Sequence, residues 1–217
     1  MTKIGWVFIL LVSFLSCNET GDRGIRLDID TLMNKTDKPD SIPQKITIRE
    51  DSLAGRPITF YLQHPGIPKI AKDIYTGKTP VTDDSSIMAL MDSVFTKNKE
   101  TQPFYFLTIT GTMKQADGAY AEPLGTMARK YVETQTSDFL NYFINEPLLT
   151  EEHFNLWARN VAWEIMLDAE VQREKAEVKI TETKMKANCK SCTKEQTNKM
   201  NDFIKRVGDN IIKYSRK

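Results

Sequence analysis

The residues best suited to chemistry are Cys189 and Cys192, which form a C-x-x-C pair. Such a pair can form a disulfide, act as a redox-active dithiol, or supply half of a zinc site. Zinc needs two further ligands, and the sequence has neither a second C-x-x-C nor two closely spaced histidines. A redox-active pair needs its first cysteine at the start of a helix that follows a strand, whereas a charged, helix-like segment precedes Cys189. We therefore predict a disulfide that closes the tip of a helical hairpin.

The two histidines of the chain, His64 and His153, suggest little further chemistry. His153 follows two glutamates without forming an HExxH motif, so we predict that it caps the start of a helix. His64 precedes a proline and is predicted to lie in a surface turn. The sequence contains no GxSxG, P-loop or GxGxxG motif, and we predict no metal and no cofactor. A hydrolase that uses paired carboxylates stays open as an alternative, because the separation of such a pair is set in three dimensions.

A short acidic motif lies near the N-terminus. Asp28-Ile29-Asp30-Thr31-Leu32 is similar to the DxDxT motif of haloacid-dehalogenase-type phosphatases. The resemblance implies a phosphate-accepting nucleophile at Asp28 and a general acid at Asp30. In that family the motif ends a buried strand, whereas the polar run GDRGIR precedes it here and no alternating strand–helix pattern follows. We interpret the motif as part of a solvated acidic linker.

The first residues of the chain have the features of an export signal. Lys3 is followed by a largely apolar run of 12 residues, Ile4–Leu15, and then by Ser16 and Cys17. The run is too short for a membrane-spanning helix, which needs about 20 residues. This pattern resembles a bacterial lipoprotein signal, although Phe14 departs from the smaller aliphatic residue typical of that position. The resemblance implies that residues 1–16 are removed and that Cys17 is lipidated, which anchors the protein in a membrane of the bacterial cell envelope, on the periplasmic side or at the outer membrane surface.

Composition and charge divide the rest of the chain into a tether and a domain. Residues 17–44 are rich in Asp, Asn, Thr, Gly and Pro and are predicted to be a flexible tether, followed by a single domain over residues 45–217. Residues 172–217 hold 13 Lys and Arg against 6 Asp and Glu, and the preceding part of the mature chain has the opposite excess. We expect this basic segment to lie on its own acidic body rather than on an anionic partner. The overall net charge of +1 argues against nucleic acid as a partner.

Periodicity in the sequence predicts a mainly α domain of antiparallel helices, with a small N-terminal β-hairpin and a C-terminal helical hairpin. Alternating residues predict strands at 45–50 and 58–63. The segment from Pro103 to Asp117 has strand-like composition, but its length and its leading proline favour a helix. No Gly or Pro interrupts residues 150–188, which predicts one long helix, and a last helix is expected from about residue 194. Shorter helices are predicted at residues 68–76, 83–95, 121–133 and 138–144.

The binding hypothesis rests on a concentration of aromatic residues between Phe104 and Trp163. We expect most of them to form the core and a minority to line a groove for a partner. The candidate partner-binding residues are Tyr105, Tyr120, Tyr142, Trp157, Lys205 and Arg206. The leading hypothesis is therefore a non-catalytic, lipid-anchored envelope protein that acts by protein–protein binding, with toxin neutralisation of the immunity type as one such role. The alternatives are the carboxylate hydrolase and a protein that binds anionic lipid through its basic hairpin.

Overall fold

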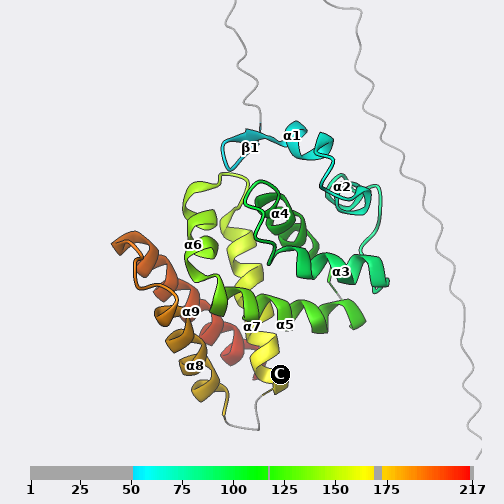
Figure 1. The fold of residues 1–217 in the computed structure, drawn as a ribbon. Coiled ribbons are helices and arrows are strands. Elements are labelled where there is room, and N and C mark those ends of the chain that lie inside the picture. Colours follow the sequence, from blue (N-terminus) through cyan, green and yellow to red (C-terminus); the bar gives the residue numbers. More distant parts are fainter. Residues whose placement is uncertain (1–50, 117, 169–172, 216–217) are drawn as a thin grey trace, which may run out of the picture. The chain divides into compact units, whose positions relative to one another are not determined.

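The computed structural model describes residues 51–116, 118–168 and 173–215, which all belong to one compact unit (Figure 1). The predicted signal, the lipidation site Cys17, the tether and the DxDxT-like motif lie outside the described residues. None of the helices in the described part is both long and apolar enough to cross a membrane.

The described part is mainly helical, as predicted, with a two-stranded antiparallel hairpin at its beginning. The strands are β1 (Ser52–Leu53) and β2 (Arg56–Pro57). The helices are α1 (Ile58–Gln63), α2 (Lys69–Tyr75), α3 (Ser85–Ser93), α4 (Gln102–Thr112), α5 (Gly118–Thr134), α6 (Thr136–Asn145), α7 (Glu151–Asp168), α8 (Glu174–Ala187) and α9 (Lys194–Ser215). The hydrophobic core draws on all nine of these helices.

Helix α4 is the most deeply buried element and resolves the ambiguous segment in favour of a helix. Pro103 stands in its first turn, where the missing N–H costs nothing. Every residue from Gln102 to Thr110 is buried, and so is Thr112. A helix covered on all sides shows no amphipathic stripe, which explains why its sequence resembles a buried strand. Gly111 is the exposed exception within it.

The β-hairpin lies at residues 52–57, between the two predicted strands. The predicted first strand at 45–50 lies outside the described residues, and the predicted second strand at 58–63 is a helix. Ala54 and Gly55 both have positive φ, at 49° and 74°, so they form a tight turn with the strands directly on either side. Pro57 has no N–H to donate to a longer ladder, and residues 58–63 form α1 instead. The Tyr61 hydroxyl then donates to the carbonyl of Leu53 at 2.8 Å, which fastens α1 to the hairpin.

The single helix predicted over residues 150–188 is also wrong, because α7 and α8 are separate helices. Figure 1 shows α8 running back beside α9 after α7 ends. Ion pairs hold α8 against α5, with Arg129 2.6 Å from Glu177 and Lys184 2.7 Å from Glu133. Neither the end of α7 nor the start of α8 contains a glycine or proline that would signal the break. The reversal is therefore attributed to contacts between residues far apart in the sequence.

Hydrogen-bonded caps mark the starts of α7 and α9. Thr150 and His153 exchange hydrogen bonds at the start of α7: the Thr150 N–H donates to His153 Nδ1, and the His153 N–H donates to Thr150 Oγ1. Thr193 and Gln196 do the same at the start of α9. Both are reciprocal caps of the capping-box kind. The role predicted for His153 is therefore confirmed.

Candidate functional site

The structure corrects the prediction that four aromatic residues anchor a partner, because all four are buried in the core. Each of them also has a hydrogen bond or a stacking contact with another residue of the domain. The indole N–H of Trp157 donates to Thr110 Oγ1 at 2.9 Å, and the ring of Tyr142 stacks on Phe106 with centroids 4.5 Å apart. The hydroxyl of Tyr120 is 2.9 Å from Thr112 Oγ1, and that of Tyr105 donates to the Gly66 carbonyl at 3.4 Å.

The proposed cationic residues lie on α9 and have acidic partners on the protein itself. Lys205 is exposed and pairs with Asp209 at 2.9 Å. Arg206 pairs with Glu151 of α7 at 2.9 Å, and its guanidinium lies over the ring of Phe154. Lys199 also pairs with Glu151. A hydrogen bond from Lys199 is the main reason why the pKa of Glu151 lies below its usual value, with Arg206 adding to the effect.

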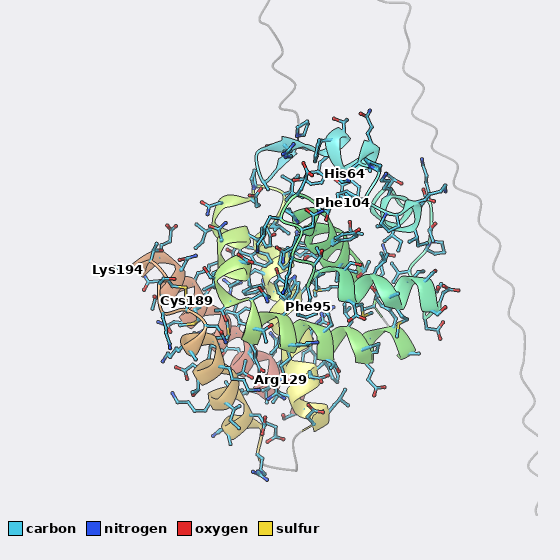
Figure 2. The ribbon with its side chains drawn as sticks, viewed as in Figure 1. His64, Phe95, Phe104, Arg129, Cys189 and Lys194 are labelled. Atoms are coloured by element: carbon cyan, nitrogen blue, oxygen red, sulfur yellow. A yellow bond between two sulfur atoms is a disulfide. The ribbon has the colours of Figure 1, made fainter. Side chains whose placement is uncertain are left out.

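Glu133 of α5 is the centre of a second, more deeply buried ion-pair network. Its carboxylate accepts from Arg129 at 3.1 Å, Thr181 at 2.9 Å and Lys184 at 2.7 Å. Burial alone would raise the pKa of Glu133, but the hydrogen bonds from Lys184, Thr181 and Arg129 hold it below its usual value. Figure 2 shows Arg129 where α5 faces α8. The Lys184–Glu133 pair and the pairs of Glu151 with Lys199 and Arg206 place basic residues of the C-terminal segment on the acidic body, as the charge pattern predicts.

Cys189 and Cys192 form a disulfide between α8 and α9, with Cα atoms 5.0 Å apart. Figure 2 shows Cys189 and Lys194 near each other at this turn. Both cysteines are partly buried against the core, and the side-chain amide of Asn188 donates to the Glu133 carbonyl at 2.8 Å. The disulfide therefore closes the tip of the helical hairpin and lies against the end of α5, which is the structural role predicted from the sequence.

A cleft of about 630 Å³ lies beside α4 and is here called the α4 cleft. Its walls come from the end of α2, the segment that leads to α3, one face of α4, and the start of α7. The lining residues are Ile74, Tyr75, Gly77, Thr79, Pro80, Val81, Leu107, Thr108, Gly111, Thr112, Gln115, Leu148 and His153. This volume lies within the range of small-ligand sites, about 300–1,000 Å³. No Asp, Glu, Lys or Arg is among these described lining residues, so the cleft does not supply the carboxylate pair that the hydrolase alternative requires.

Two polar groups of the α4 cleft lack protein partners among the described residues. Thr108 is only 3% exposed, and its Oγ1 is buried without a hydrogen-bond partner. His153 accepts a hydrogen bond at Nδ1 from the Thr150 N–H at 3.2 Å. In a neutral imidazole this arrangement places the proton on Nε2. Nε2 then becomes a donor, and no hydrogen bond to a described residue uses it.

A second candidate is formed by exposed apolar side chains on the last three helices, here called the C-terminal apolar surface. Its members are Trp163 (44% exposed) and Leu167 (64%) of α7, Ile180 (42%) of α8 and Ile212 (48%) of α9. Two hollows adjoin it. One, of about 540 Å³, lies between α8 and α9 and includes Val178, Gly208 and Ile212 in its lining. The other, of about 590 Å³, includes Trp163, Leu167 and Tyr214.

Neither candidate site is marked by a strong signal in the sequence. The exposed residues of the C-terminal apolar surface look like core residues in an amphipathic pattern. Gly111, inside a predicted helix, was the one signal for the α4 cleft, since a glycine within a helix calls for a packing or functional reason. No group of three or more His, Cys, Asp or Glu within the described ranges could hold a metal ion. Comparisons with protein-family models, curated proteins and solved structures give no match to this chain.

Proposed function

We propose that this chain is a non-catalytic, lipid-anchored protein of the bacterial envelope that binds a protein partner through its C-terminal apolar surface. The observation that carries the proposal is the position of the exposed large hydrophobic side chains. Trp163, Leu167, Ile180 and Ile212 all belong to α7, α8 and α9. Single exposed hydrophobics are ordinary on a protein surface, but Trp163 and Leu167 line one hollow and Ile212 lines another, and side chains of a partner can be buried in both.

The chemistry of this surface favours a protein partner over an anionic membrane. Trp163 packs against Tyr214 with ring centroids 4.9 Å apart, and large amphipathic aromatics of this kind are the commonest binding hot spots. The adjoining hollow between α8 and α9 includes both Glu174 and Lys175 in its lining. Charges of both signs around an apolar centre are typical of protein interfaces, whereas attraction to anionic lipid requires an excess of cations.

The anchor is proposed from the N-terminal sequence. The Lys3, apolar run and Cys17 pattern supports acylation at Cys17. The tether of residues 18–44 then gives the domain a reach of about 30 Å from the membrane if it behaves as a flexible coil. We expect the mass of the membrane-extracted protein to correspond to a chain that begins at Cys17 and carries acyl groups. A chain that still begins at Met1 would contradict the anchoring.

Affinity capture with surface variants tests the docking. A Trp163→Ser/Leu167→Ser variant removes the exposed apolar groups, and a Trp163→Phe/Leu167→Met variant keeps them and is the matched control. We expect the captured partner to be lost with the serine variant and retained with the control, while circular dichroism shows that both are folded. Equal recovery of the same partner with both variants would contradict the proposal.

A further inference from the structure

We propose that the α4 cleft is a binding site for a small uncharged ligand that carries hydroxyl groups and an acetamido group, the chemistry of a neutral N-acetylated sugar. The inference does not depend on the proposed docking surface. The α4 cleft draws on α2, α4 and the start of α7, and the C-terminal apolar surface uses other residues.

Gly111 is the first observation that supports a ligand site. It is the exposed residue of an otherwise buried helix, and it lies in the lining of the cleft. Outside its own helix, a Cβ at this position would have no described heavy atom within 4 Å. Packing therefore does not require a glycine, and alanine is the better helix former. The missing side chain instead leaves space on the wall of the cleft.

The unused hydrogen-bonding groups are the second observation. His153 Nε2 has a proton to donate when the ring is neutral, because Nδ1 is occupied by the Thr150 N–H. Gln115 is exposed and adds an amide with both donor and acceptor capacity. Thr108, one turn before Gly111, has a buried hydroxyl without a partner. A threonine in a helix populates two χ1 rotamers, so this hydroxyl can turn toward a bound ligand.

The remaining lining residues define the chemical class of the ligand. Tyr75, Leu107 and Leu148 are apolar walls that suit the methyl of an acetamido group and the C–H faces of a sugar ring. The acetamido carbonyl suits the His153 donor. With no Asp, Glu, Lys or Arg in the described lining, a charged ligand would lose its hydration without gaining an ionic partner. The site therefore favours an uncharged ligand.

The probe is N,N′-diacetylchitobiose, titrated into the full chain purified in detergent and followed by calorimetry and amide NMR. Two comparison disaccharides test whether the acetamido group and the absence of charge are recognised. Cellobiose lacks the acetamido groups, and de-N-acetylated chitobiose carries amines that are protonated in mildly acidic buffer. We expect saturable binding of the acetylated disaccharide, with chemical-shift changes at Gly111 and Gln115, and at least tenfold weaker binding of both comparators.

Matched variants locate the site. Gly111→Leu fills the cleft and should abolish binding, whereas Asn201→Leu introduces the same side chain at an exposed position of α9 and should bind like wild type. His153→Glu keeps the reciprocal cap with Thr150 but removes the Nε2 donor, and we expect at least a tenfold loss. Thermal unfolding checks that each variant is folded.

Three results would overturn the proposal. One is the absence of saturable binding of the acetylated disaccharide by the folded wild-type chain. Another is equal binding of the deacetylated, cationic comparator. The third is a folded Gly111→Leu variant with wild-type affinity. None of these results bears on the docking of a protein partner at the C-terminal apolar surface, so the two proposals fail separately.

Discussion

Replacing Glu133 with glutamine removes the charge at the centre of the network that joins α5 to α8. In the folded chain this carboxylate is 7% exposed and accepts from Arg129, Thr181 and Lys184. Glutamine has a similar volume, so the variant leaves no cavity. The substitution leaves Lys184 without its acidic partner. Arg129 loses its pair with Glu133 but keeps its pairs with Asp168 and Glu177.

The expected loss of stability lies below that of a fully buried pair. Removing one member of a fully buried ion pair costs about 3–5 kcal/mol. The Lys184 side chain is half exposed and can be rehydrated, and Arg129 keeps other acidic partners. We therefore expect a loss of about 2 kcal/mol in the free energy of unfolding. For a domain of this size, that corresponds to a fall of about 4–8 °C in Tm.

The same network predicts a specific pH dependence. The pKa of Glu133 in the folded state lies below its usual value, because hydrogen bonds from Lys184, Thr181 and Arg129 outweigh the effect of burial. A group with a lowered folded-state pKa stabilises the fold fully above its unfolded-state pKa, about 4.3 for glutamate, and loses that contribution as the pH falls through the folded-state value. The stability difference between wild type and Glu133→Gln should therefore be constant at neutral pH and shrink in acid.

Urea unfolding followed by circular dichroism, from neutral to acidic pH, measures both effects. Glu182→Gln is the matched control, because it removes an acid of α8 that pairs within that helix with the exposed side chains of Lys179 and Lys186. The control should lose about 0.5 kcal/mol or less. A loss of stability in Glu133→Gln no greater than that in Glu182→Gln, or a deficit that persists unchanged in acid, would contradict this role of Glu133.

Further predictions concern buried hydroxyls and the disulfide. Thr108→Val removes a hydroxyl with no partner among the described residues and should stabilise the fold by about 1 kcal/mol, whereas Thr110→Val leaves the indole N–H of Trp157 without an acceptor and should destabilise it by about 1–3 kcal/mol. Thermal unfolding should show a higher Tm for Thr108→Val and a lower Tm for Thr110→Val than for wild type. A shift of Tm in the same direction in both variants would contradict this prediction. Reducing the Cys189–Cys192 disulfide should lower the free energy of unfolding by about 2 kcal/mol, since it closes a short loop. A loss of helix signal in native buffer on reduction would contradict this limited role.

The helical class of the fold could be predicted because most helix starts and stops are encoded locally. The cap at Thr150, the helix-starting Pro103 and the left-handed Gly77, with φ of 70°, all lie where the sequence indicates. The failures have non-local causes. Residues 58–63 alternate like a strand, but the turn at Ala54 and Gly55 ends the pairing before them. The reversal between α7 and α8 brings α8 into ion pairs with α5 and buries Met185 in the core, and no local pattern reveals these contacts.

The candidate sites were less predictable than the fold. Trp157 and Trp163 belong to the same aromatic stretch, yet the first is fully buried and the second is 44% exposed. Helical periodicity gives the spacing of these residues but not which neighbouring helix covers each. The α4 cleft likewise needs the end of α2 beside α4 and the start of α7. Its residues come from separate parts of the chain, so sequence spacing alone cannot bring them together.

Site-specific photo-crosslinking in intact cells tests the proposed docking most directly. A photoreactive residue at Leu167, in the C-terminal apolar surface, is compared with one at the exposed Lys97, between α3 and α4. We predict a crosslink to one protein partner from position 167 and none to that partner from position 97. Equal crosslinking from both positions, or the absence of a protein adduct at position 167 in cells that hold the anchored chain, would contradict it.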